Sequence, residues 1–140
     1  ISKFKNFQLL SPTEKEARIA LGAYNEGVEW LANNLIKLTG SKNLIMKLGS
    51  EGFISYETEI DGSINRQHFP ALNPNPVDVT GAGDSLIAAI SVGLCSGVSL
   101  MQSAAIGTCM AALAVQTIGN IPVSKEILKR NLSEIMTNAL

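Results

Sequence analysis

The chain has 140 residues, the length of one domain, and 46% of them are hydrophobic, which is enough for a sizeable core. We therefore expect one compact unit. Its 11 basic and 12 acidic residues are intermixed and give a formal net charge of −1, so no region of the sequence is marked for binding nucleic acid or an anionic membrane. The sequence has no continuous apolar run of about 18 residues, and the opening residues ISKFKNFQLL lack the apolar core of a secretory signal. These features predict a soluble, cytoplasmic protein.

The first residue and the two cysteines indicate what kind of chain this is. The chain opens on Ile1 rather than methionine and leads directly into a strand pattern, so we expect a fragment of a longer protein. Cys95 and Cys109 lie among small and apolar residues in helical segments. This setting predicts two buried structural thiols rather than a disulfide framework or a metal site.

The first half of the chain mixes strand and helix signals. In chain order, the predicted elements are a strand at 7–10, helices at 13–21 and 26–38, and strands at 43–48, 52–57 and 63–69. Gly22 and Gly40 are placed to close the two helices, and Asp61-Gly62 is a hairpin signal between the last two strands. Tyr24 and Trp30 are expected to pack against the helices.

The second half is predicted to be helical after a proline-rich connection. The segment PALNPNP at 70–76 holds three prolines, which donate no backbone hydrogen bonds, so we expect a surface connection and not a domain linker. Helices are predicted at 83–96, 99–116 and 124–137, with N-caps at Ser99 and Ser124 and stops at Gly97 and Gly119-Asn120. Leu86, Ile90 and Leu94 form a predicted core stripe. This order of elements predicts a layered α/β domain.

The segment DVTGAGD, from Asp78 to Asp84, combines a phosphate cradle with an acid. Gly81 and Gly83 let the backbone N–H groups approach an anion closely, and the positive end of the following helix faces the same place. A carboxylate beside a phosphate is repelled by it, unless it removes a proton from a nucleophile that attacks the phosphate. Asp84 is therefore the candidate catalytic base.

Two common nucleotide-binding motifs do not fit this turn. Leu86 stands where a dinucleotide-binding fingerprint needs its third glycine, and a proline-rich loop precedes the turn instead of a hydrophobic strand. The Walker phosphate loop needs Gly-Lys-Ser/Thr after the glycines, and this chain has none there. With both motifs excluded, the segment is interpreted as an anion-binding turn that ends in an acid.

DVTGAGDSLIAAISVGL resembles the signature of the PfkB, or ribokinase-like, carbohydrate kinases. The resemblance implies a three-layer α/β/α fold, of which residues 1–140 would be the C-terminal, nucleotide-binding part. It also implies an ATP-dependent phosphotransferase that acts on a hydroxyl of a sugar or sugar phosphate. By position, Gly81, Ala82 and Gly83 would form the anion hole, and Asp84 would deprotonate the hydroxyl.

Three further segments extend the resemblance. LSPTEKEA is similar to the family's strand-exit motif, in which Glu16 would help to organise Mg²⁺, although Thr13 stands where asparagine is usual; a solvated helix carboxylate is the other interpretation of Glu16. KLGSEG is similar to the turn that lies along the nucleotide, and implies nucleotide contacts by Lys47, Gly49 and Gly52, with a solvated Lys47 as the alternative.

SAAIGTCMAALAVQTIGN resembles the alanine-rich helix that abuts adenine, which places Thr108 near the base. Asp78 and Thr80 match positions that help to hold a monovalent cation, K⁺ in the family, and Thr80 also adjoins the nucleotide site. His68, the one histidine of the sequence, is predicted to be a partly exposed polar residue rather than a catalyst.

The sequence describes the phosphate chemistry better than its acceptor. The segment from KLTGSKNLIMKLGSEG to DVTGAGD resembles the branch that phosphorylates heptose phosphates, while ribokinase, fructokinase and other branches stay open. Two alternatives to a kinase are a non-catalytic nucleotide- or phosphate-binding module and a fragment that is inactive without its N-terminal half. We expect a small-molecule sugar substrate and no nucleic-acid or membrane partner. The sequence leaves a homodimer open as the oligomeric state.

Overall fold

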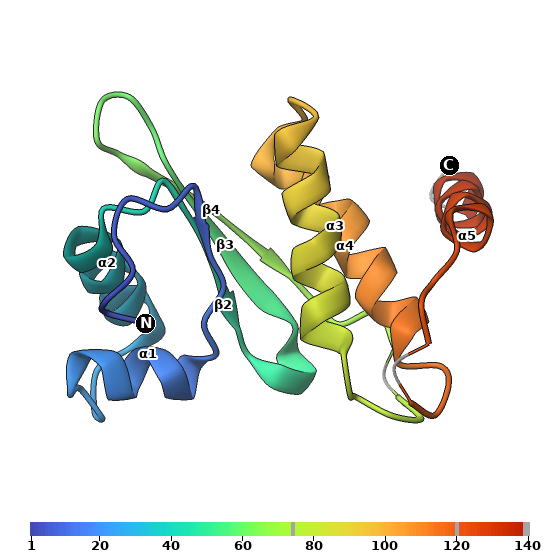
Figure 1. Cartoon of the computed structure of the whole chain (residues 1–140), viewed down its shortest axis with the longest axis horizontal. Helices are drawn as coiled ribbons and strands as arrows, with labels where there is room; N and C mark the ends of the chain where they lie inside the picture. The colour runs from blue at the N-terminus through green and yellow to red at the C-terminus, as the bar shows by residue number, and fades with distance from the viewer. Residues whose placement is uncertain (74, 120, 139–140) are drawn as a thin grey trace. The chain divides into compact units, whose positions relative to one another are not determined.

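The computed structural model describes residues 1–73, 75–119 and 121–138 (Figure 1). It divides into two compact units, Ile1–Pro70 and Ala71–Leu140, where the composition predicts one. The boundary falls at the start of PALNPNP, which is therefore the connection between units and not merely a surface loop. Prolines cannot donate backbone hydrogen bonds, so such a segment adds few ties to either side. Of the sequence signals, Pro74 and Asn120 lie outside the described residues.

The predicted order of elements is confirmed. In chain order these are β1 (Leu9–Leu10), α1 (Glu14–Leu21), α2 (Val28–Thr39), β2 (Asn43–Lys47), the 3₁₀ helix η1 (Gly49–Glu51), β3 (Phe53–Thr58), β4 (Ile64–Phe69), α3 (Ala82–Cys95), α4 (Leu100–Ala114) and α5 (Lys125–Asn138). β1 is shorter than the predicted strand because only Leu9 and Leu10 pair with β2. α4 ends at Ala114, with Val115 as its C-cap, several residues before Gly119.

The first unit holds a four-stranded sheet in the order β1-β2-β3-β4. β1 runs parallel to β2, and the remaining pairs are antiparallel. Asp61-Gly62 turns the chain between β3 and β4 as predicted, with Gly62 in the left-handed region at φ +83°. The two rings of the register pair Phe53 and Phe69 stack with centroids 5.0 Å apart, which fixes one end of this hairpin.

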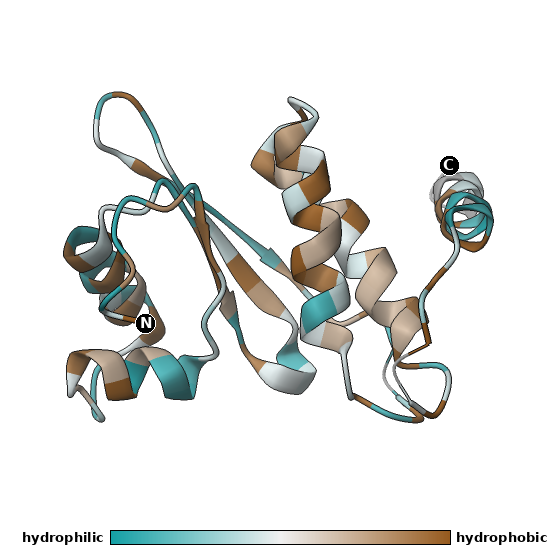
Figure 2. Ribbon diagram, in the orientation of Figure 1, coloured by the Kyte–Doolittle hydropathy of each residue, from teal (hydrophilic) through white to brown (hydrophobic). Residues whose placement is uncertain are grey.

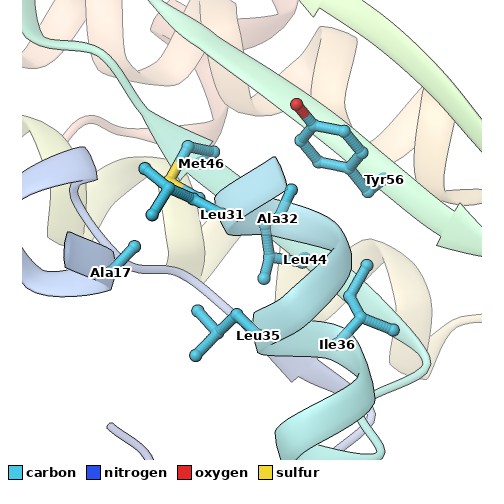
Figure 3. Close-up of a cluster of buried hydrophobic side chains, with 8 residues drawn as sticks. All are labelled: Ala17, Leu31, Ala32, Leu35, Ile36, Leu44, Met46 and Tyr56. Carbon is cyan, nitrogen blue, oxygen red and sulfur yellow. The ribbon is translucent and has the colours of Figure 1, made fainter. Parts of the chain in front are cut away.

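One face of the sheet is covered by α1 and α2 (Figure 3). Leu44 and Met46 lie two residues apart on β2 and so point to the same side, and Tyr56 is the register partner of Leu44 on β3. The helices contribute Ala17, Leu31, Ala32, Leu35 and Ile36 to this cluster. Full burial of each large apolar side chain stabilises the fold by about 1.5–3 kcal/mol, so this cluster is the core of the first unit.

The second unit is built on the close packing of α3 against α4. A Cβ added at Gly107 would lie 2.9 Å from side-chain carbons of both Leu86 and Ile90, and one added at Gly93 would lie 2.4 Å from Ser103 Oγ. Both helices are apolar along most of their length, whereas α5 mixes polar and apolar residues (Figure 2). Leu86 and Ile90 are buried as predicted, and Leu94 is half-buried. None of the described helices has the length and apolarity that a membrane span needs.

Three packing predictions are wrong. Cys95 is exposed at the last turn of α3, although Cys109 is buried as expected. Tyr24 is 69% exposed because it lies in the connection between α1 and α2 and not on a helix. Trp30 is 42% exposed because α2 turns Leu31 and Leu35 to the core, which leaves Trp30 on its outer side.

Candidate functional site

The DVTGAGD segment forms a tight turn into the N-terminus of α3. Gly81 has φ +77°, in the left-handed region, and is the N-cap residue of the helix. The Ala82 N–H donates to the carbonyl of Val79 (3.2 Å) and the Ser85 N–H donates to the carbonyl of Gly81 (2.9 Å). Gly83 already lies in the helical first turn, so its value at this position is its lack of a side chain and not a left-handed backbone.

The N-termini of α3 and α2 lack a side-chain cap, unlike those of α1 and α4. Thr13 and Ser99 cap α1 and α4 with side-chain oxygens, whereas Gly81 offers no side-chain cap to α3. First-turn N–H groups have no carbonyl partner within their own helix, and no described residue accepts those of Gly83 and Asp84, which suits them to an external acceptor. Together with the helix dipole, this arrangement suits an anion.

Asp84 is the third residue of α3 and its side chain is exposed. The sequence places it at the junction of turn and helix, and the structure does so too. An exposed carboxylate here is open to a substrate hydroxyl, but a first-turn acid also stabilises a helix by itself. The catalytic role of Asp84 stays a prediction.

Asp78 binds two backbone amides. Its Oδ1 accepts the N–H of Thr80 and its Oδ2 accepts the N–H of Gly119, each at 2.9 Å. These bonds, first that from Gly119 and then that from Thr80, hold the pKa of Asp78 below its ordinary value, so the carboxylate stays ionised. We call Asp78, Thr80, Gly119 and residues 81–84 the glycine-turn cluster.

The predicted cation residues Asp78 and Thr80 are thus neighbours in the structure. Each carboxylate oxygen accepts several hydrogen bonds or cation contacts, and the exposed Thr80 hydroxyl adds a further oxygen ligand. The pair therefore fits a monovalent cation. Gly119 was predicted only as a helix stop, because nothing in its local sequence indicates that its amide meets a carboxylate 41 residues away.

Thr108 lies on α4 and is 8% exposed. Its hydroxyl donates to the carbonyl of Ala104 at 2.9 Å, the usual backbone partner of a mid-helix threonine. The hydroxyl oxygen can still accept a hydrogen bond, so a contact with a nucleotide base stays a prediction.

In the first unit, Glu16 belongs to a capping box at the start of α1. Glu16 Oε2 accepts the N–H of Thr13 (2.7 Å), while Thr13 Oγ1 accepts the N–H of Glu16 (3.2 Å). The bond from the Thr13 backbone, opposed by partial burial and aided by the Thr13 hydroxyl and the charge of Lys47, holds the pKa of Glu16 below its ordinary value. Thr13, which departs from the asparagine of the family motif, therefore has a structural role as a cap.

Lys47 lies close to this capping box. Its N–H donates to the carbonyl of Pro12 (2.8 Å), and its backbone forms a parallel bridge with Thr13. Beyond Lys47, the turn around η1 is made by Gly49 at φ +63° and Gly52 at φ +88°. We call Glu16, Lys47, Gly49 and Gly52 the lysine-turn cluster.

His68, predicted to be a partly exposed polar residue, is exposed and contacts the same turn: its Nε2 lies 2.9 Å from the carbonyl oxygen of Glu51. Within the described part of the chain, no three His, Cys, Asp or Glu residues gather into a possible metal cage. Mg²⁺ in phosphoryl-transfer sites is held by one or two carboxylates together with substrate phosphates and water. A single ionised, exposed carboxylate such as Glu16 fits that requirement.

The chain is similar to known proteins over most of its length. The profile described as pfkB family carbohydrate kinase matches residues 4–127. The chain is 30% identical over 126 residues to the Bifunctional protein HldE of Trichlorobacter lovleyi, a match that covers 88% of this chain and 25% of that protein.

Among solved structures, ribokinase from Thermotoga maritima superimposes with a TM-score of 0.77 at 30% identity, over 90% of this chain and 42% of that one. Ribokinase from Arabidopsis thaliana, solved with ribose and ATP, gives a TM-score of 0.72 at 27% identity, over 89% of this chain and 40% of that one. The predicted ribokinase-like α/β fold is confirmed by these matches. The chain spans about a quarter of the HldE length and two fifths of the ribokinase length.

Proposed function

Because the chain belongs to the pfkB family of carbohydrate kinases, we propose that its protein transfers the γ-phosphoryl group of ATP to a hydroxyl of a sugar or sugar phosphate. In this proposal residues 1–140 are the C-terminal, nucleotide-binding part of the kinase domain. The observation that carries it is the uncapped N-terminus of α3, where a left-handed Gly81 precedes an exposed acid in the first helical turn.

The glycine turn would stabilise the charge on the transferred phosphoryl group. The N–H groups of Gly83 and Asp84, which no described residue accepts, would act with the positive end of α3 on phosphoryl oxygens without having to reorient during the reaction. Gly81, Ala82 and Gly83 together would form this anion hole. Small residues here let the backbone approach the anion closely.

Asp84 would act as the general base. The acceptor hydroxyl oxygen attacks the γ-phosphorus, its proton passes to the Asp84 carboxylate, and the bond from the γ-phosphorus to the bridging oxygen breaks with its electron pair left on ADP. An ionised acid is needed for this step, and its exposure leaves it accessible to the hydroxyl.

The remaining predicted site residues would bind the nucleotide and the cations. Lys47, Gly49 and Gly52 would contact the nucleotide, with Thr80 and Thr108 as further contacts. Glu16 would hold Mg²⁺, which neutralises phosphate charge when bound, and Asp78 with Thr80 would hold K⁺. Their support is the left-handed glycines of the turn, the ionised state of both carboxylates and the nearness of Asp78 to Thr80.

The molecule that accepts the phosphoryl group is proposed only as a class, a sugar or sugar phosphate. Heptose phosphate is the first substrate to test, because the sequence resembles that branch of the family; ribose, fructose and the substrates of other branches are the alternatives. We expect the enzyme to act in the cytoplasm, with a homodimer as the assembly to be tested.

Replacement of Asp84 tests the proposal. In the parent protein, Asp84→Asn should lower kcat by about 10²–10⁴-fold, the usual contribution of a general base, with little change in the KM for ATP. Glu126→Gln is the matched control, because Glu126 is likewise an exposed acid in the first turn of a helix, α5. Equal activity of the Asp84→Asn variant and the unaltered enzyme on the best substrate would exclude Asp84 as the base.

Calorimetry distinguishes the two alternatives to a kinase, a nucleotide-binding module and an inactive fragment. Titration of the 140-residue chain with ATP and Mg²⁺ should release heat if the chain is a nucleotide-binding module without turnover of its own. No heat would instead indicate a fragment that needs its N-terminal half. Retention of an acid at position 84 favours the kinase over the binding module, because a pure anion site gains nothing from a carboxylate.

A further inference from the structure

The turn between β3 and β4 presents an apolar side chain that is not part of the core. Ile60 is fully exposed at the tip of this turn, between the acids Glu59 and Asp61. The Gly62 N–H donates to the carbonyl of Glu59 at 3.0 Å. The Ser63 N–H donates to Asp61 Oδ1 at 2.9 Å, so both bonds hold the turn without the side chain of Ile60. Gly, Pro, Asn, Asp and Ser are the usual residues of turns, so an isoleucine at the tip has no local explanation.

A shallow hollow of about 480 Å³ lies against α1 in the same unit. We call it the α1 hollow, and its lining residues are Glu14, Lys15, Arg18, Ile19 and Tyr24. Ile19 and Tyr24 are each more than half exposed and give the hollow an apolar wall. Lys15 is exposed and forms no ion pair with any residue that the structure describes. The hollow therefore combines apolar surface with an unpaired positive charge.

Arg18 holds the α1 hollow in shape. Its Nη1 donates to the carbonyls of Tyr24 (3.0 Å) and Glu26 (2.8 Å), and its Nη2 donates to Glu14 Oε1 (2.6 Å). The backbone that carries Tyr24 is therefore fixed, although the ring itself is exposed. Because Arg18 neutralises Glu14, the net charge of the hollow is the one positive charge of Lys15. A ligand would thus meet a preformed surface.

The hairpin tip, residues 59–61, and the α1 hollow are complementary. An isoleucine side chain fits an apolar wall, and the two acids that flank it fit an unpaired lysine. Asp61 is ionised, because hydrogen bonds from the Ser63 hydroxyl and then from the Ser63 N–H hold its pKa below its ordinary value. We infer that the hairpin tip of one copy of the chain binds in the α1 hollow of a second copy.

The contact has to form between copies. The turn between β3 and β4 and the helix α1 lie at opposite ends of the first unit, so the tip does not reach the hollow of its own chain (Figure 1). Two different surfaces meet, so each pair of copies keeps one free tip and one free hollow, unlike a symmetric dimer. One turn in one hollow buries far less than about 1,200 Å², which is the class of weak, transient contacts. The inference does not depend on the proposed kinase activity.

A dilution series followed by NMR on the labelled 140-residue chain tests the contact. Between about 0.05 and 1 mM protein, the amide shifts of residues 59–63 and of Lys15, Ile19 and Tyr24 should change together, with one apparent Kd. Ile60→Ser should weaken the association at least about tenfold, because the side chain that enters the apolar wall is lost. Ile118→Ser is the matched control, since Ile118 is likewise an exposed isoleucine in a connection, and it should leave the association unchanged.

Charge reversal and mixing then test the head-to-tail arrangement. Lys15→Glu should also abolish association below about 1 mM, because it sets a third acid against the tip, and Glu59→Lys in that background should restore it. Ile60→Ser keeps an intact hollow and Lys15→Glu keeps an intact tip. A mixture of these two variants should therefore form one-to-one pairs that grow no further in sedimentation velocity.

Three results would overturn the inference. The first is an unaltered chain that stays monomeric up to about 1 mM, in which case a second copy is not what occupies the hollow. The second is association that Ile60→Ser leaves unchanged, which would place the contact on another surface. The third is a mixture of the two variants without pairs, although each alone is folded by circular dichroism. The dilution series needs no variant, so misfolding of a variant does not weaken the first test.

Discussion

At the scale of the residue, the structure gives different environments to side chains that look alike in the sequence. Tyr56 is fully buried in the core of the first unit, whereas Tyr24 is largely exposed. The Tyr56 hydroxyl donates to Glu29 Oε1 at 3.1 Å, and Arg66 pairs with the same carboxylate. A buried phenol beside a carboxylate is held in its neutral form.

This environment predicts an unusual alkaline titration. Burial, and next the negative charge of Glu29, raise the pKa of Tyr56 well above its ordinary value. Because the folded pKa exceeds the unfolded one, the stabilising contribution is complete below about pH 10 and is lost as the pH rises further. In a Tyr24→Phe variant, absorbance of phenolate at 295 nm should therefore appear only together with the loss of circular dichroism.

Glu29→Gln in the same background removes the neighbouring negative charge. The phenolate signal should then appear at a lower pH than with Glu29 present, since one of the causes of the raised pKa is gone. Ionisation of Tyr56 near pH 10 in the fully folded chain would contradict the prediction.

At the scale of the element, Thr13 and Glu16 show how a helix start is fixed locally. The capping box satisfies two backbone donors that α1 itself cannot. Thr13→Ala should lower the free energy of unfolding by about 1 kcal/mol, the usual cost of losing an N-cap side chain. Urea titration measures this, and Thr13→Ser, which keeps the hydroxyl, should stay close to the unaltered chain. A loss of the same size in both variants would show that the methyl group matters and the cap does not.

α3 and α4 illustrate a conflict between helix propensity and packing. By propensity alone, Gly107→Ala should stabilise α4 by about 1 kcal/mol. The added Cβ, however, would lie 2.9 Å from carbons of Leu86 and Ile90 and 3.2 Å from the Leu86 carbonyl oxygen. Overpacking of this kind costs about 1–3 kcal/mol, so we expect a lower thermal midpoint for this variant. A raised midpoint would mean that the two helices can move apart at little cost.

The elements could be predicted well because their signals are local. Gly22 and Gly40 end their helices and Ser99 caps α4 as expected, since each needs only its neighbours in the chain. The bond from Gly119 to Asp78 could not be predicted, because it depends on how α3 and α4 pack. The exposure of Cys95 and Trp30 was missed for the same reason: local hydrophobicity does not say which side of a helix meets the core. The roles of Asp84, Lys47 and Thr108 stay predictions.

At the scale of the whole molecule, the main departure from expectation is the division at Pro70. The sequence pattern around PALNPNP indicates an extended segment in either case, and only the contacts made by its flanking elements decide whether it links two units. Residues 71–77, apart from Pro74, are exposed or half-exposed, and none of the described elements includes them. Such a connection is more open to a protease than the helices and strands on either side.

Limited proteolysis tests this division. Leu72 is 49% exposed in the connection, so a brief digestion with chymotrypsin should cut after it and give fragments of residues 1–72 and 73–140, identified by mass spectrometry. Leu72→Ala removes the preferred side chain and should abolish this pair of fragments while other early cuts, such as those at the exposed Phe4 and Tyr24, persist. Because cleavage needs several residues of extended backbone, its rate reports how freely the connection opens. A connection that resists the enzyme while α2 or β4 is cut would show that residues 1–140 behave as one cooperative unit.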